Sequence, residues 1–308
     1  MACPKVEQIG CGMICGEGPH WDHNAKVLYY VDVKGCTVNK YNPACNEHTT
    51  AKIEGDAVTL IIPIEGKKDQ FVISVGRSLA IMTWDGVSCT PCDVQIVTTV
   101  DTDPKKVTNR FNDGKADPTG RLWAGTMAPD LKAGVVAPNM GSFYSFDKCF
   151  NPTTHLTEVS ISNGLAWSQD LKHMYFIDSA KFTIDVFDFD VKTPKISNRR
   201  VVFDLQKNGL KGLPDGMTID TEGKLWVAVF DGSGVLRVDP TNGKLLTKID
   251  IPSPQTTSVT FGGPELDELY VTSANFEQTP EQLKPGSGGT FRITGTGAKG
   301  YPGQNFKL

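Results

Sequence analysis

The sequence predicts an all-β fold, a six-bladed β-propeller, and two features of the chain support this prediction. First, apolar or alternating runs of roughly four to six residues are separated by turn clusters, and helical periodicity is almost absent. Second, one unit recurs: an acidic or amide residue before a glycine, a short strand, a turn of the form Asp-x-x-Gly and a second strand. Its glycines at 114, 164 and 216 lie about 50 residues apart, a spacing typical of propeller blades.

The predicted blades can be followed in order along the chain. Copies of the unit begin at Glu17, Asp113, Asn163 and Asp215, with a degenerate copy at Ser258. The first two copies lie about two periods apart, so a blade without the glycine motif is needed between them. The apolar runs 58–63, 71–75 and 79–84 supply it. Because an open ring would leave unpaired strand edges, we expect the late strand 290–294 to pair with 6–9.

The residues that precede the motif glycines all carry side-chain oxygens: Glu17, Asp113, Asn163 and Asp215. If each begins the innermost strand of its blade, the repeat brings all four to one end of the central channel. Carboxylate and amide oxygens suit a hard divalent cation such as Ca²⁺, whereas zinc prefers imidazole or thiolate. The alternative is ordinary turn chemistry, in which glycine supplies a positive φ. Four copies in register favour a central metal site.

Length and composition exclude several classes of protein. A chain of 308 residues is long enough for one large all-β domain, which we expect to span 1–308. The formal net charge of −4 gives no basic surface for nucleic acid, and no apolar run is long enough to predict a membrane span. The N-terminus has no apolar signal region, so we expect a cytoplasmic protein. The final Lys307 and Leu308 match the end of a peroxisomal signal, which is the alternative.

The eight cysteines form no compact disulfide framework, and the lone C-x-x-C at 89–92 is interpreted as a turn. The five histidines lack a metal-ligand spacing, and no serine lies in a G-x-S-x-G elbow. Any hydrolysis would therefore use a metal-polarised carbonyl and a carboxylate base.

The stretch 109–115 is a second candidate for chemistry. In an extended segment Arg110 and Asn112 point to the same face, where they could hold the oxygens of a polar substrate. A surface ion pair beside an Asx turn is the alternative interpretation.

Several motifs of the chain resemble a known family. Those that resemble regucalcin nearly letter for letter are 109–115, 124–127, 161–165, 197–200 and 214–217. Those that resemble firefly members more closely are 16–23, 83–88, 257–259, 261–264 and 267–274. Over essentially its whole length, the chain resembles the family of regucalcin (senescence-marker protein), gluconolactonases and luciferin-regenerating enzymes.

This resemblance implies a six-bladed propeller with one divalent metal ion, often calcium, at the channel mouth. Its matching motifs imply that Glu17, Asn163 and Asp215 are the metal ligands. Asp215 also matches the general base proposed for lactonases, where water attacks a lactone carbonyl polarised by the metal. Zinc, manganese or magnesium could also enter a site made of oxygens.

The same resemblance implies that Arg110 and Asn112 bind substrate. Where regucalcin has a Glu that contacts the sugar lactone, this chain has Pro129 followed by Asp130, and the firefly members resemble it in this respect. The carboxylate of Asp130 is one methylene shorter, which weakens the expectation of a sugar lactone and leaves the metal site intact.

The resemblance therefore implies a metal-dependent hydrolase with a small-molecule substrate. The leading hypothesis is an enzyme of luciferin-regenerating type, which converts oxyluciferin towards 2-cyano-6-hydroxybenzothiazole. The alternatives are a regucalcin-like gluconolactonase and a calcium-binding regulatory protein without turnover. A benzothiazole would need an apolar wall, for which Met127, Trp167 and Phe230 are candidates.

Overall fold

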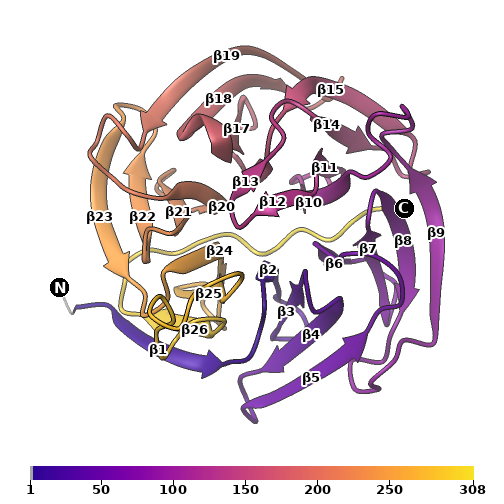
Figure 1. Cartoon of the computed structure of the whole chain (residues 1–308), viewed down its shortest axis with the longest axis horizontal. Coiled ribbons are helices and arrows are strands. Elements are labelled where there is room, and N and C mark those ends of the chain that lie inside the picture. The colour runs from indigo at the N-terminus through magenta and orange to yellow at the C-terminus, as the bar shows by residue number, and fades with distance from the viewer. Residues whose placement is uncertain (1–2) are drawn as a thin grey trace.

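The computed structural model describes residues 3–308, which form six four-stranded antiparallel sheets arranged as the blades of a ring (Figure 1). This confirms the predicted six-bladed propeller. The described residues contain one 3-10 turn, η1 (Ser179–Lys181), and no α-helix. None of their helices is long and apolar enough to cross a membrane.

Each blade runs outward from the channel in the order of its strands. The first three blades comprise β2 (Gly16–Asp22), β3 (Val27–Asp32), β4 (Thr37–Asn42) and β5 (Glu47–Lys52); β6 (Ile61–Pro63), β7 (Gln70–Val75), β8 (Ser78–Thr83) and β9 (Asp93–Thr99); and β10 (Arg110–Ala116), β11 (Leu122–Met127), β14 (Gly141–Phe146) and β15 (Pro152–Val159). A small hairpin, β12 (Asp130–Lys132) with β13 (Val135–Val136), is inserted in the third blade.

The last three blades complete the ring. They comprise β16 (Ser162–Trp167), β17 (His173–Asp178), β18 (Thr183–Asp190) and β19 (Lys195–Asp204); β20 (Leu213–Ile219), β21 (Leu225–Phe230), β22 (Gly234–Asp239) and β23 (Lys244–Asp250); and β24 (Gln255–Gly262), β25 (Glu268–Ala274), β26 (Thr290–Thr294) and β1 (Lys5–Gly10). The pairing of β26 with β1 confirms the predicted closure, in which Val6 lies opposite Ile293.

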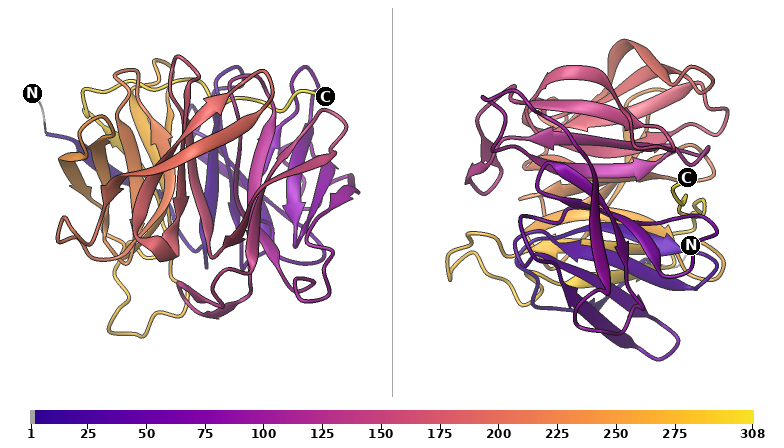
Figure 2. Two further views of the ribbon diagram at one scale, coloured as in Figure 1. Left: turned by 90° about the horizontal axis from the view of Figure 1, so that it is seen from above. Right: turned by 90° about the vertical axis from the view of Figure 1, so that its right-hand side faces the viewer.

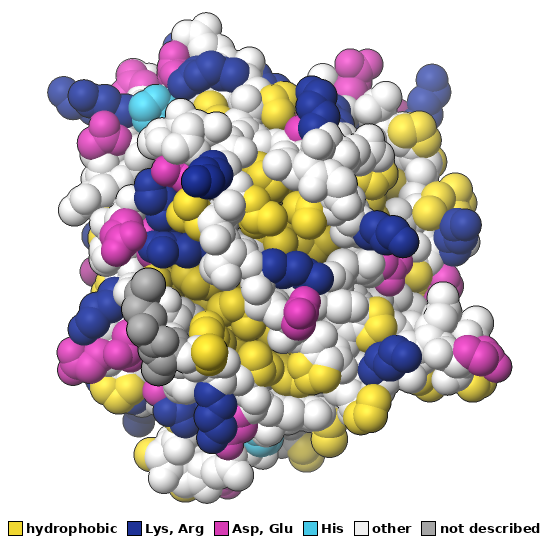
Figure 3. Space-filling view, turned by 90° about the vertical axis from the view of Figure 1, so that its left-hand side faces the viewer, with side chains coloured by type: hydrophobic (Ala, Val, Ile, Leu, Met, Phe, Trp, Pro, Cys, Tyr) yellow, Lys and Arg dark blue, Asp and Glu magenta, His cyan; other side chains and the backbone are white. Residues whose placement is uncertain are grey.

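The hydrophobic core is divided into six clusters, one between each pair of neighbouring blades. Strands such as β3, β11 and β21 are buried along their whole length because both of their faces pack against a neighbouring blade. The outermost strands are largely exposed. On the side drawn in Figure 3, hydrophobic side chains gather in a central band, and charges of both signs surround it.

The repeated Asp-x-x-Gly turn has a structural role in two blades. In each copy one carboxylate oxygen of Asp117 or Asp220 accepts backbone N–H groups of the turn. The other oxygen accepts the indole N–H of Trp123 or Trp226 at 2.9 Å. These aspartates are buried, so the turn also satisfies a tryptophan donor inside the core.

The two faces of the ring differ. The segment after β26 crosses one face along a diameter of the ring, and the β12–β13 hairpin and the loop after β25 project from the other (Figures 1 and 2). This C-terminal strap, residues 299–307, is held by a bridge between Asp220 and Gly300 and by another between Ile64 and Phe306. Cys89 and Cys92 are exposed thiols on the connection between β8 and β9, in line with the predicted turn.

Candidate metal and substrate site

The inner strands carry a bulge at the motif positions. Pairing slips in β2 between Glu17 and His20, and equivalent irregularities occur in β10, β16 and β20. A bulge bends the strand and redirects its side chains. In each case the redirected side chain enters the channel mouth on the face from which the β12–β13 hairpin projects.

The structure corrects the predicted position of Asp113. Asn163 directly follows the last paired residue of its strand before the bulge, and so does Asp215. In β10 the residue in that position is Asn112, because pairing ends at Phe111 and resumes at Gly114. The alignment of the copies on their glycines had therefore placed the functional position of β10 one residue too late, at Asp113 instead of Asn112. Asn112 therefore lines the mouth, and Asp113 lies deeper in the channel.

The motif glycines are explained by close approach between inner strands. A Cβ on Gly164 would lie 2.6 Å from the Asp215 carbonyl oxygen, and a Cβ on Gly216 would lie 2.0 Å from the Ser258 hydroxyl. Of the four glycines only Gly18 has a positive φ. The turn-chemistry alternative therefore does not account for the motif.

Two buried aspartates hold the chain just before the bulges. Asp32, at the end of β3, accepts the backbone N–H of Cys15 at 2.9 Å, and Asp178, at the end of β17, accepts that of Ile161 at 3.0 Å. Cys15 and Ile161 each lie two residues before a candidate ligand. The second strand of each blade thus fixes where its first strand enters the mouth.

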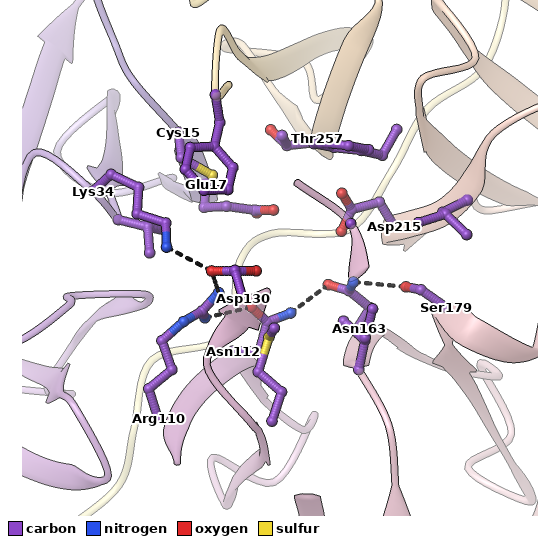
Figure 4. A pocket seen from close by; sticks show the side chains of 17 residues that line it. Cys15, Glu17, Lys34, Arg110, Asn112, Asp130, Asn163, Ser179, Asp215 and Thr257 are labelled. Atoms are coloured by element: carbon purple, nitrogen blue, oxygen red, sulfur yellow. Dashed lines mark hydrogen bonds and ion pairs between the residues drawn. The ribbon is translucent and has the colours of Figure 1, made fainter. Parts of the chain in front are cut away.

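The predicted ligands Glu17, Asn163 and Asp215 come together in a pocket of about 60 Å³. Figure 4 shows the Glu17 and Asp215 carboxylates pointing toward one another from opposite sides. The Asn163 amide is fixed in orientation, because its Nδ2 donates to Ser179 Oγ at 2.8 Å and its Oδ1 accepts from Asn112 Nδ2 at 3.0 Å. Its oxygen therefore faces the pocket.

The two carboxylates lack a cationic partner among the described residues. Burial raises the pKa of Glu17 to about 8, and the Asp113 charge adds to the shift. Burial also raises the pKa of Asp215, followed by repulsion from Glu17 and Asp113. Arg110 opposes both shifts, but as a smaller effect. Two acids this close to each other are stable as carboxylates only with added positive charge nearby.

The donor set fits a cation that prefers oxygen. Two carboxylates and one oriented amide oxygen are ligands typical of calcium, which completes its shell with water or substrate. Among residues 3–308, no three His, Cys, Asp or Glu side chains cluster closely enough to hold a metal. The set therefore depends on the Asn163 amide for its third protein oxygen.

A polar wall flanks these oxygens. Asp130, in the β12–β13 hairpin, accepts from Lys34 Nζ at 2.5 Å and from Arg110 Nη2 at 3.4 Å through the same oxygen, Oδ2. Arg110 Nη1 also donates to Asn112 Oδ1 at 2.7 Å, and Lys34 Nζ lies 4.5 Å from the centre of the Phe276 ring. The predicted substrate residues Arg110, Asn112 and Asp130 are therefore joined in one network at the mouth.

The comparisons with known proteins show which family this chain resembles. A family model described as "SMP-30/Gluconolactonase/LRE-like region" matches residues 15–275. The chain belongs to this family. The matched region contains every strand that contributes a candidate ligand.

Individual members of the SMP-30/gluconolactonase/LRE-like family are similar over the whole chain. The structure of a luciferin-regenerating enzyme has a TM-score of 0.93 at 44% identity, covering 99% of this chain and 100% of that one. Chicken (Gallus gallus) regucalcin is 40% identical over 306 residues, 98% of each chain. The structure of a regucalcin from Agrobacterium tumefaciens has a TM-score of 0.85 at 25% identity, covering 96% and 95%. These likenesses indicate an enzyme with a small-molecule substrate.

The site of this family member also contains residues that the sequence did not reveal. Lys34 comes from the turn between β3 and β4, Ser179 from η1, and Thr257 from the bulge of β24. Lys34 and Ser179 lie outside the repeated motif, so its period gave no signal for them. Thr257 directly precedes Ser258, where the degenerate copy was placed. Aligning this copy by its strand register would have identified Thr257.

Two of the three residues predicted for the apolar wall of the mouth lie there. Met127 and Phe230 line the pocket, together with Phe276. Trp167 does not, because it lies at the opposite end of β16 and lines a different pocket on the strap face. The expectation that Trp167 contributes to the substrate wall was therefore wrong.

Proposed function

We propose that this chain is a divalent-metal-dependent hydrolase of the luciferin-regenerating type, acting on a small molecule at the channel mouth. The observation that carries the proposal is the convergence of Glu17 and Asp215, two carboxylates without a cationic partner, beside the oriented amide oxygen of Asn163. A divalent cation would supply the missing positive charge. Calcium is the first choice, and the Agrobacterium relative is described as a calcium-binding protein.

In this proposal the residues of the chain have separate roles. Glu17, Asn163 and Asp215 would hold the cation, which when bound would supply a positive charge that polarises a substrate carbonyl and acidifies water. Asp215 would also accept a proton from the attacking water, since its carboxylate faces the pocket. Arg110 and Asn112 donate to oxygens of the substrate and orient it.

Two features favour oxyluciferin over a sugar lactone. Met127, Phe230 and Phe276 give the pocket an apolar side, which suits a flat aromatic substrate. One oxygen of Asp130 is already engaged by Lys34 and Arg110, which leaves less of this carboxylate for sugar hydroxyls. A gluconolactonase is the second candidate, favoured by the Arg110–Asn112 pair and by the family. Calcium binding without turnover is the third.

The test compares both substrates on protein stripped with a chelator and then given calcium, manganese, zinc or magnesium. We expect turnover of oxyluciferin that needs metal and falls at least tenfold in Asp215→Asn. Asp188→Asn, at an exposed surface ion pair, is the matched control and should keep full activity. Turnover of D-glucono-δ-lactone alone would favour the second candidate. Bound metal without turnover of either substrate would refute the hydrolase proposal and leave calcium binding.

A further inference from the structure

The channel opens into a second pocket on the strap face. This pocket has a volume of about 240 Å³. The pocket at the channel mouth that contains Glu17, Asn163 and Asp215, called the metal mouth below, has a volume of about 60 Å³. Residues from β2, β10, β16, β20 and β24 line the strap-face pocket, and residues 301–304 of the strap form one wall. A narrow part of about 20 Å³ shares Pro19, His20 and Lys115 with it. The proposed function uses none of these side chains.

The strap is fixed at both ends of this wall. On one side the backbone N–H of Thr221 donates to Lys299 at 2.8 Å. On the other, Phe306 is fully buried and its N–H donates to the Pro63 carbonyl at 2.9 Å. Between them Asn305 Oδ1 lies 3.2 Å from His20 Nε2. The pocket is therefore preformed, which lowers the ordering cost of binding a ligand.

Charge in this pocket has one sign. Of the described residues that line it, Lys115 alone is a lysine or arginine, and none is an aspartate or glutamate. Lys115 Nζ donates to the carbonyls of Leu165 at 3.1 Å and Met217 at 2.6 Å, which leaves one N–H unused. Asp113 lies in the narrow part of the channel and forms no ion pair with it among the described residues. Burial lowers the pKa of Lys115 and the Asp113 charge opposes this shift, so a bound carboxylate would favour the charged form of Lys115 further.

The remaining walls are mostly apolar. Leu165, Trp167 and Ile219 come from the inner strands, and Tyr301 and Pro302 come from the strap. Thr218 and Thr260 also line the pocket. An apolar pocket with one half-buried ammonium and a few neutral polar groups matches a small ligand with an apolar body and one acidic group.

We propose that this strap-face pocket is a binding site for a small aromatic or apolar carboxylate, separate from the metal mouth, with Lys115 as the residue that recognises the carboxylate. A neutral ligand of the same shape would gain the apolar contacts but would not gain the ion pair. The site therefore discriminates by charge, and the proposal does not depend on the reaction at the other mouth.

The test measures binding of 1-naphthoate and of uncharged 1-naphthalenemethanol by titration calorimetry, using the whole chain with calcium present. We expect the naphthoate to bind at least tenfold more tightly. Lys115→Gln keeps donors for the two carbonyls and removes the charge, so it should abolish that difference and leave naphthalenemethanol binding unchanged. Arg110→Gln, at the metal mouth, should leave both affinities unchanged.

A second pair of variants keeps the test valid if Lys115→Gln does not fold. Gln169 is exposed at the rim of the pocket, and Gln169→Trp should weaken both probes several-fold by narrowing the entrance. Gln95→Trp, on the exposed outer strand β9, is its control and should change neither. Equal affinity for the two probes, or loss of naphthoate binding in Arg110→Gln rather than in the strap-face variants, would overturn the proposal.

Discussion

Ser179→Ala tests whether the proposed metal ligands depend on a residue that is not itself a proposed ligand. Ser179 is buried, with 1% of its surface exposed. Its Oγ accepts from Asn163 Nδ2 at 2.8 Å and donates to the Pro214 carbonyl at 2.6 Å. It therefore joins the Asn163 amide to the residue that precedes Asp215. Alanine removes both bonds and leaves a buried amide and a buried carbonyl unsatisfied.

The magnitudes follow from these two bonds. A typical hydrogen bond contributes about 0.5–1.5 kcal/mol net, so the free energy of unfolding without metal should fall by about 1–3 kcal/mol. Residues that orient metal ligands commonly change metal affinity by about 10–100-fold. We expect a loss of calcium affinity in that range, because the Asn163 oxygen is no longer held toward the pocket.

The assays are urea unfolding in chelator and calorimetric titration with calcium. Ser145→Ala is the matched control, since Ser145 is also 1% exposed and its Oγ lies 2.8 Å from His155 Nε2, away from the mouth. Both variants should lose stability in chelator, and only Ser179→Ala should lose calcium affinity. A Ser179→Ala protein that is destabilised but binds calcium as tightly as the parent would refute the reasoning.

Three further predictions concern stability. Burial lowers the pKa of His20 to about 4, below its ordinary 6.5, so the unfolded state takes up the proton first as the pH falls. The free energy of unfolding should therefore decrease by about 3 kcal/mol as the pH falls from 6.5 to 4. In a pH series of urea melts, His20→Gln should flatten this dependence, and an unchanged slope would contradict the assignment. Gly164→Ala should lower the free energy of unfolding by about 1–3 kcal/mol and weaken calcium binding, because the new Cβ would lie 2.6 Å from the Asp215 carbonyl oxygen of β20. A decrease of less than about 0.5 kcal/mol in urea unfolding would contradict this contact. Asp220→Asn should cost about 3 kcal/mol, because it leaves Arg237 without its buried carboxylate. Asp117→Asn, which removes no arginine partner, should cost less in the same melts, and equal losses would rule out the ion pair as the cause.

The sequence by itself determined the architecture, because the features that encode a blade are local. Short strands recur throughout the chain, and the motif glycine recurs in four of the six units at a period of about 50 residues or its double; such a period specifies a ring of blades. The closing pair of β26 with β1 was also predictable, since an open ring leaves unpaired edges. The repeat pointed to Glu17, Asp113, Asn163 and Asp215 as a group because each precedes a motif glycine, and the family resemblance reduced this group to the three candidate ligands Glu17, Asn163 and Asp215.

Only the tertiary structure decided which residues complete the site. Asn112 rather than Asp113 reaches the mouth because the bulge sets the register, and a bulge is defined by pairing with β11. Lys34 and Ser179 reach the mouth from connections outside the repeat. Trp167 lies four residues beyond Asn163, about 13 Å along an extended strand, so it emerges at the other end of the channel. Sequence spacing records position along one strand, whereas a site at the axis is assembled from the ends of several strands, and their register and packing are properties of the closed ring.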